Sequence, residues 1–261
     1  MQKIKMLLLS LLLFVCTQAQ ATIYAVVVGV SNYAHIRGLR YCDDDAREFY
    51  QYLRGEEGLR IPASQVTLLL DEEASNENIL RAMYQQFAKA TAEDVVILYF
   101  SGHGDRGYFC SYNTERSGVG GTLLHSDVKK AFQSSEASIK LCFADACHAG
   151  TMFQPQKQGL VFQSATAADF DTQVAVFMSC RSDETSLESG ETQRGVFTYY
   201  LMKGLKGRAD ANGDRQISIA ELFAYTSKNV RHYGETQAGG HAQNPTLTGR
   251  FSANMILVKL R

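Results

Sequence analysis

The sequence contains few prolines, few cysteines and no run of basic residues. With three prolines in 261 residues, and no internal repeat or low-complexity segment, no linker marks a boundary between domains. The net charge is −1, and the lysines and arginines are scattered rather than interleaved with aromatic residues. This pattern argues against a nucleic-acid partner. We therefore expect one large domain whose partner is not a nucleic acid.

The cysteines are too few for a disulfide scaffold, and no CxxC or other zinc spacing is present. One of the six, Cys16, lies near the N-terminus. The other five are an odd number, so at least one thiol is unpaired in an oxidising compartment. These five are Cys42, Cys110, Cys142, Cys147 and Cys180.

The N-terminal residues 1–21 have the pattern of a signal peptide. Two lysines precede an apolar stretch, residues 6–16, and small and polar residues follow it. The stretch is too short to span a membrane, and no second hydrophobic span occurs later in the chain. We expect export to the periplasm or the extracellular space. Cys16 leaves a lipoprotein as an alternative, although Val15 is a poor small residue before it.

Two short apolar runs end in residues that carry chemistry. Residues 139–144 lead into 145–150 (DACHAG), and residues 95–100 lead into 101–104 (SGHG). Both runs are typical of buried strands in a parallel sheet. If these strands are neighbours, His103 and Cys147 meet at the carboxyl edge of the sheet, where open α/β folds place their sites.

A thiol beside an imidazole suits nucleophilic catalysis. The imidazole of His103 can increase the thiolate fraction of Cys147 and later protonate a leaving amine. The backbone N–H groups of Gly104 and Cys147 can form a two-donor oxyanion hole. We therefore interpret His103 and Cys147 as the catalytic pair.

These two motifs resemble those of the metacaspase branch of the caspase-like cysteine peptidases. Further segments resemble the same family: residues 23–30, 39–46, 174–184 and 195–201. The resemblance implies a caspase-like α/β three-layer sandwich, with a mostly parallel six-stranded sheet and helices on both faces. It places one peptidase domain at residues 22–261, large-subunit-like to about 157 and small-subunit-like from about 174.

Hydrophobic periodicity predicts alternating strands and helices. The expected strands are residues 23–30, 65–70, 95–100, 139–144, 174–180 and 255–260. The expected helices are residues 43–55, 78–92, 125–133, 196–205 and 219–230, with a hairpin over 107–113 and 120–124 and an irregular segment at 241–248.

The resemblance also implies a pocket for the residue before the scissile bond. The matching positions are Cys42, Asp45, Ser101 and Asp145. Two carboxylates around one cavity favour a cationic side chain, so we predict cleavage of peptides or proteins after arginine or lysine. The alternative for residues 43–45 is an acidic first turn that interacts favourably with a helix dipole.

A loop near residue 210 fits the EF-hand calcium pattern except at Arg215, where the pattern has glycine. Calcium is therefore a candidate ligand of this loop. The peptidase reaction itself requires no cofactor. The oxygen ligands of the calcium would be the side chains of Asp210, Asn212, Asp214, Ser218 and Glu221 and the carbonyl of Gln216. The alternative is a polar turn closed by a capping box between Ser218 and Glu221.

In the resembling family, the segment 151–172 corresponds to the loop between the two subunits, which is cut in some members. Lys157 is its only basic residue and a candidate self-processing site. The alternative is an uncut surface loop.

Two other classes of function remain open. One is a catalytically silent caspase-like scaffold or binding module. The other is a metal hydrolase using His103, Cys147 and His148, which lacks metal-ligand spacing.

The remaining histidines are interpreted as ordinary surface or loop residues: His35, His125, His148, His232 and His241. The oligomeric state is not predicted.

Overall fold

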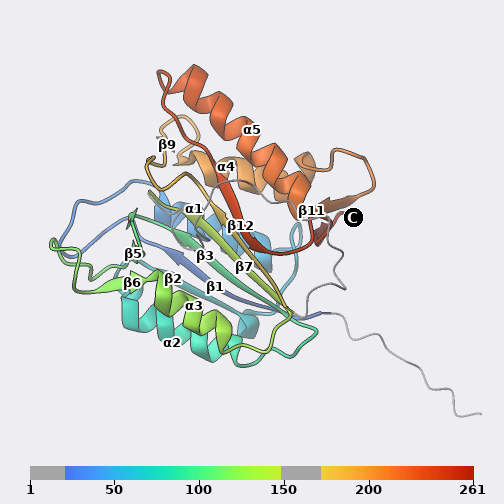
Figure 1. The fold of residues 1–261 in the computed structure, drawn as a ribbon, viewed down its shortest axis with the longest axis horizontal. Coiled ribbons are helices and arrows are strands. Elements are labelled where there is room, and N and C mark those ends of the chain that lie inside the picture. The colour runs from blue at the N-terminus through green and yellow to red at the C-terminus, as the bar shows by residue number, and fades with distance from the viewer. Residues whose placement is uncertain (1–20, 148–171) are drawn as a thin grey trace, which may run out of the picture.

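A computed structural model of the protein describes residues 21–147 and 172–261. Its centre is a six-stranded sheet in the order β12-β8-β7-β3-β1-β2, and every neighbouring pair is parallel except β12 with β8 (Figure 1). The strands are β1 (Ile23–Gly29), β2 (Val66–Leu70), β3 (Val95–Ser101), β7 (Ile139–Asp145), β8 (Gln173–Met178) and β12 (Thr246–Arg250).

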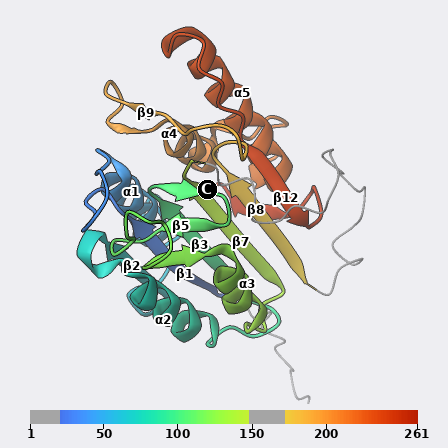
Figure 2. The ribbon, with the colours of Figure 1, turned by 60° about the vertical axis from the view of Figure 1, so that its left-hand side comes forward.

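Helices cover both faces of this sheet, as Figures 1 and 2 show. One face packs against α1 (Cys42–Arg54), α4 (Val196–Lys203) and α5 (Ile219–Gln237). The other face packs against α2 (Asn76–Phe87) and α3 (His125–Gln133). The predicted three-layer α/β sandwich is therefore confirmed.

Strand β3 shows why the sequence folds in this way. Val96, Leu98 and Phe100 point into the core shared with α2 and α3. Ile97 and Tyr99 alternate with them and point into the core shared with α1 and α4. A strand buried on both faces needs apolar residues at every position, so it appears in the sequence as an unbroken apolar run.

Smaller elements lie around the main sheet. A three-stranded sheet is formed by β4 (Gly104–Asp105), β5 (Tyr108–Cys110) and β6 (Thr122–Leu124), which confirms the predicted hairpin. A second hairpin, β9 (Glu188–Ser189) with β10 (Arg194–Gly195), lies within a polar stretch where no strand was predicted. The short helical turns are η1 (Ala63–Gln65), η2 (Asp71–Glu73) and η5 (Gly204–Arg208).

The sixth strand of the sheet is not the predicted one. Thr246–Arg250 forms β12 in a region where residues 241–248 were expected to be irregular. The apolar run predicted at 255–260 instead forms β13 (Ile256–Lys259), which pairs with β11 (Gln216–Ser218) outside the main sheet. Strand β12 is an edge strand in which Leu247 alone is buried, so it produces no apolar run.

Several sequence predictions lie outside the described residues. They are the leader (apart from Ala21), His148 and Lys157. The undescribed segment 148–171 falls between β7 and β8, which are parallel neighbours in one sheet. Within residues 21–147 and 172–261, no helix is long and apolar enough to cross a membrane.

Candidate active site

The two sequence motifs meet because their strands are direct neighbours. Strands β3 and β7 are parallel, and their last residues, Ser101 and Asp145, are register partners. His103 and Cys147 each lie two residues beyond this pair, at the same carboxyl edge. The N–H of Gly102 also donates to the carbonyl of Asp145 over 3.1 Å, which ties the two loops together.

Gly104 approaches the backbone of Cys147 very closely. A Cβ at Gly104 would lie 2.7 Å from the Cys147 carbonyl oxygen, so the larger side chain of any other residue would push the loops apart. This approach places the two predicted oxyanion donors, the N–H groups of Gly104 and Cys147, on adjoining backbone. Their role as donors stays a prediction.

The imidazole of His103 is half-buried and held by the loop that follows β1. Its Nε2 lies 2.9 Å from the carbonyl oxygen of Arg37. A carbonyl can only accept, so this contact requires the proton on Nε2 and leaves Nδ1 as the free acceptor. The backbone N–H of His103 donates to Tyr33 Oη over 2.7 Å, and the two rings lie 5.2 Å apart. Neither Arg37 nor Tyr33 was predicted, because each lies in a loop without a periodic pattern.

The thiol of Cys147 is also half-buried. The N–H of Ser186 donates to its Sγ over 3.4 Å, and the Ser186 hydroxyl donates to Asp145. Gln243 donates its Nε2 to that hydroxyl and to the Ser179 carbonyl, each over 3.1 Å. Ser186 and Gln243 were not predicted because both lie in polar loops without periodicity.

The local electrostatics favour a neutral pair. Burial lowers the pKa of His103, although the Arg37 carbonyl and Glu188 act in the opposite direction. Burial raises the pKa of Cys147, and the N–H of Ser186 partly offsets this. Both shifts favour a protonated thiol and an uncharged imidazole at neutral pH.

The structure brings together the four predicted pocket residues. Asp45 accepts from the Ser101 hydroxyl over 3.1 Å, and Ser101 pairs with Asp145 across the strands. Cys42 begins the helix that carries Asp45 and is buried. Residues Asp45 and Asp145 are 0% and 5% exposed, so the pair lies beneath the surface of the site.

The N-terminal turn of α4 binds both carboxylates. The Gly195 N–H donates to both oxygens of Asp45 over 3.1 Å. The N–H and hydroxyl of Thr198 donate to Asp145 Oδ2 over 3.1 and 2.9 Å. Despite these donors, burial raises the pKa of each carboxyl, and the charge of Asp145 raises that of Asp45 further. Two buried like charges favour retention of a proton by the pair.

Cys147 differs from the other described cysteines. Cys42, Cys110, Cys142 and Cys180 are buried, whereas Cys147 is half-buried. Burial raises the pKa of Cys110 and of Cys142 to about 12, which suppresses their thiolates. Cys147 is therefore the described thiol most accessible to a substrate.

The calcium-like loop is closed by its own hydrogen bonds. The two carboxylate oxygens of Asp210 accept from the N–H groups of Gly213 and Arg215. Ser218 and Glu221 form the complete capping box of α5, so this part of the alternative is confirmed. Arg215 has φ 63°, the left-handed conformation for which the pattern calls for glycine. Calcium binding stays a prediction.

Across the described parts of the chain, no group of three or more His, Cys, Asp or Glu side chains is arranged to hold a metal ion. The metal-hydrolase alternative thus has no support among these residues, and its third ligand, His148, lies outside them.

One histidine interpretation was wrong. His125 is buried at the start of α3, 4.5 Å from the Phe109 ring, and burial lowers its pKa to about 4.

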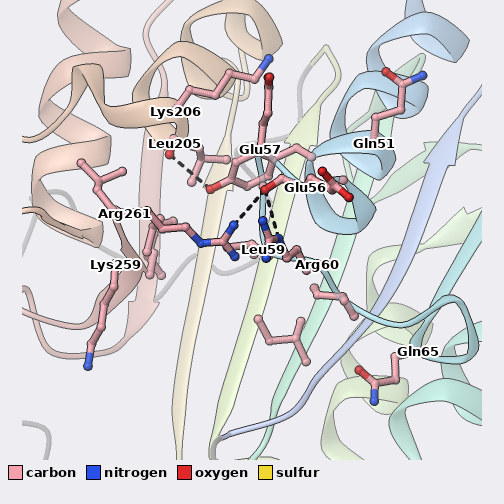
Figure 3. A pocket seen from close by; sticks show the side chains of 18 of the residues that line it. Gln51, Glu56, Glu57, Leu59, Arg60, Gln65, Leu205, Lys206, Lys259 and Arg261 are labelled. Carbon is pink, nitrogen blue, oxygen red and sulfur yellow. Dashed lines mark hydrogen bonds between the residues drawn. The ribbon is translucent and has the colours of Figure 1, made fainter.

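A cavity of about 1450 Å³ lies away from these residues, at the amino end of β1 (Figure 3). Loop 55–62, α1 and the C-terminal residues line it. Arg60 and Arg261 both donate to the Glu56 carbonyl inside it, over 3.2 and 2.9 Å. Among the residues that the structure describes, no predicted site residue lines this cavity.

The fold thus brings a cysteine and a histidine to paired strand ends of a three-layer α/β sandwich. The family model of the caspase domain matches residues 22–255. The chain belongs to this family.

Individual relatives agree with this assignment. The chain is 25% identical over 155 residues to Metacaspase-3 of Trypanosoma cruzi (strain CL Brener), covering 52% of this chain and 42% of the relative. It is 23% identical over 208 residues to the Paracaspase of Dictyostelium discoideum, covering 78% of this chain and 49% of the relative. The chain thus spans under half the length of each of these two relatives.

Solved structures share the fold. Caspase-1 from Spodoptera frugiperda superposes with a TM-score of 0.62 at 16% identity, covering 93% of this chain and 91% of that one. A protein from Geobacter sulfurreducens superposes with a TM-score of 0.60, also at 16% identity, covering 91% of this chain and all of that one. These likenesses confirm the caspase-like fold.

Proposed function

We propose that this protein is a cysteine endopeptidase that uses Cys147 and His103 and cleaves after arginine or lysine. The pairing of Ser101 with Asp145 carries the proposal, because it brings the imidazole and the thiol to one edge of the sheet. The family membership supports the same reaction class.

The reaction follows from the groups at this edge. His103 Nδ1 takes the proton of the Cys147 thiol as Sγ attacks the peptide carbonyl. The oxyanion accepts from the N–H groups of Gly104 and Cys147, and losing one such donor typically costs about 10²–10³ in rate. The C–N bond breaks, the imidazolium protonates the leaving amine, and water then hydrolyses the thioester.

The preference for a basic residue rests on Asp45 and Asp145. Without substrate, the two buried carboxyls favour retention of a proton between them. The guanidinium or ammonium group of a substrate can take the place of that proton. An arginine can also engage carboxylate bidentately. Because both carboxylates are buried, we infer that the substrate side chain displaces donors of the α4 turn as it enters.

A peptide-library cleavage profile of the purified protein tests this function. We expect cleavage after arginine and lysine, and none by the Cys147→Ala and His103→Ala variants. Equal turnover of matched arginine and aspartate fluorogenic peptides would refute the basic preference. If wild type neither cleaves peptides nor is labelled at Cys147 by an arginyl chloromethyl ketone, the silent-scaffold alternative is correct.

Export and self-processing are parts of the same proposal. N-terminal sequencing of the protein from its native host should show removal of the leader near residue 21. Intact mass spectrometry should show a cut at Lys157 in active protein and none in Cys147→Ala. A single uncut chain of equal activity would remove the self-processing idea.

A further inference from the structure

The orientation of His103 depends on an exposed loop. The Arg37 carbonyl that accepts from Nε2 belongs to residues 30–41, which join β1 to α1. Arg37, Gly38 and Arg40 are all exposed, so burial contributes little to fixing this backbone. Hydrogen bonds must therefore fix its position.

Glu188 supplies two of these hydrogen bonds from a distant part of the chain. Its Oε1 accepts from the N–H groups of Arg40 and Tyr41, each over 2.9 Å. A further anchor is the bond from the Leu39 N–H to the Ser31 carbonyl, over 2.8 Å. A carboxylate shared by two backbone N–H groups is a strong, charge-assisted anchor.

The pairing of β9 with β10 positions Glu188 in turn. Glu188 is the register partner of Gly195 in β10, and Gly195 is the residue that donates to Asp45. The neighbouring Leu187 carbonyl accepts from the Val196 N–H over 2.8 Å, at the start of α4. One hairpin thus contacts both the substrate-pocket carboxylate and the loop that orients the histidine.

We propose that Glu188 is a positioning residue of the dyad: by binding the N–H groups of Arg40 and Tyr41, it holds the Arg37 carbonyl against His103 Nε2–H. The inference rests on the proposed function. In this arrangement, Nδ1 is kept unprotonated and available to the thiol. The negative charge of Glu188 also favours the imidazolium that forms during the reaction.

The charged and titratable groups around His103 fix the sign of the expected pH effect. Glu188 raises the pKa of His103, while Arg37 lowers it. Tyr33 packs against the ring, and Cys147 is the reacting thiol. Removing the negative charge of Glu188 must therefore lower the pKa of His103 and move the acid limb of activity to lower pH.

Steady-state kinetics separate positioning from substrate binding. Glu188→Ala loses the anchor, and we expect kcat to fall by about tenfold to a hundredfold, the range for a displaced catalytic group, with KM nearly unchanged. Glu188→Gln keeps an acceptor but loses the charge, so kcat should fall less than in Glu188→Ala while the acid limb shifts. The matched control is Glu191→Ala at the exposed turn of the same hairpin. A higher KM with unchanged kcat would overturn the proposal, because it would place Glu188 on the substrate.

Histidine NMR in the Cys147→Ala background gives an answer that does not depend on proteolysis. ¹⁵N shifts of His103, assigned with His103→Gln, should show the Nε2–H tautomer in the parent and in Glu188→Gln, and mixed tautomers in Glu188→Ala. The pKa of His103 should fall in both Glu188 variants and not in Glu191→Ala. If the Glu188→Ala and Glu191→Ala spectra and titrations agree, Glu188 has no positioning role. If wild type cleaves no peptide, the proposed function fails and the NMR result still decides this inference.

Discussion

The carboxylates of Asp45 and Asp145 both lie against the backbone of Gly195. A Cβ at Gly195 would lie 2.8 Å from Asp45 Oδ2 and closer still to Asp145 Oδ2. No side chain fits there, so glycine is required by the close approach of two buried acids. The same residue donates its N–H to Asp45, which makes it a structural part of the pocket.

Gly195→Ala should therefore damage both stability and substrate binding. Overpacking in a tightly packed site typically costs about 1–3 kcal/mol. We expect a lower melting temperature and a higher KM for arginine peptides. Gly190→Ala is the matched control, because nothing lies within 4 Å of a Cβ at that position of the same hairpin. Equal melting temperatures and KM values for the two variants would mean that the acids do not crowd Gly195.

Asp45→Asn should remove most of the preference for basic residues. The change keeps the shape of the side chain and removes one negative charge from the buried pair. Removing one partner of a buried charge pair typically costs about 2–5 kcal/mol, so kcat/KM for arginine peptides should fall at least thirtyfold. Turnover of a neutral-residue peptide should change far less. Asp44→Asn, the same charge change one residue away, should leave both values near wild type.

The sequence predicts the strand ends well and the surrounding loops poorly. The runs leading to His103 and Cys147 are buried on both faces, so their apolar character identifies them without a structure. Arg37, Ser186, Glu188 and Gly195 act through backbone groups or single polar contacts. Such contacts follow from tertiary placement and leave no periodic pattern. Strand β12 was missed for a related reason, since an edge strand needs few apolar residues.

The acid limb of activity should lie below pH 6.5. Only a neutral imidazole can accept the thiol proton, and burial lowers the pKa of His103 from its ordinary 6.5. Activity is thus retained as the pH falls through 6.5 and is lost at a lower pH, as the imidazole becomes protonated. A kcat/KM profile with an arginine peptide measures this, and histidine NMR of Cys147→Ala assigns the transition to His103. An acid-side midpoint above pH 6.5 would contradict the burial argument.

Thiol alkylation should be selective and slow at neutral pH. Cys147 is half-buried while the other described cysteines are buried, so iodoacetamide should modify Cys147 first. Burial raises the pKa of Cys147 above 9.0, so the rate should continue to increase with pH beyond that value. Peptide mapping by mass spectrometry identifies the site, with Cys147→Ala as the unreactive control. An alkylation rate of Cys147 that no longer increases above pH 7 would indicate that the resting cysteine is a thiolate and not a neutral thiol.

The loop at residues 210–221 provides the last test. The motif predicts that calcium stabilises the folded protein, and saturation to 100 times Kd is worth about 2.7 kcal/mol. For a chain of this size, we expect the melting temperature in excess calcium to exceed that in chelator by several degrees. Asp210→Ala should abolish the difference. Glu72→Ala, which removes an exposed carboxylate of η2, should preserve it. The same melting temperature with calcium and with chelator would show that the Asp210 hydrogen bonds and the Ser218–Glu221 capping box close the loop without a metal.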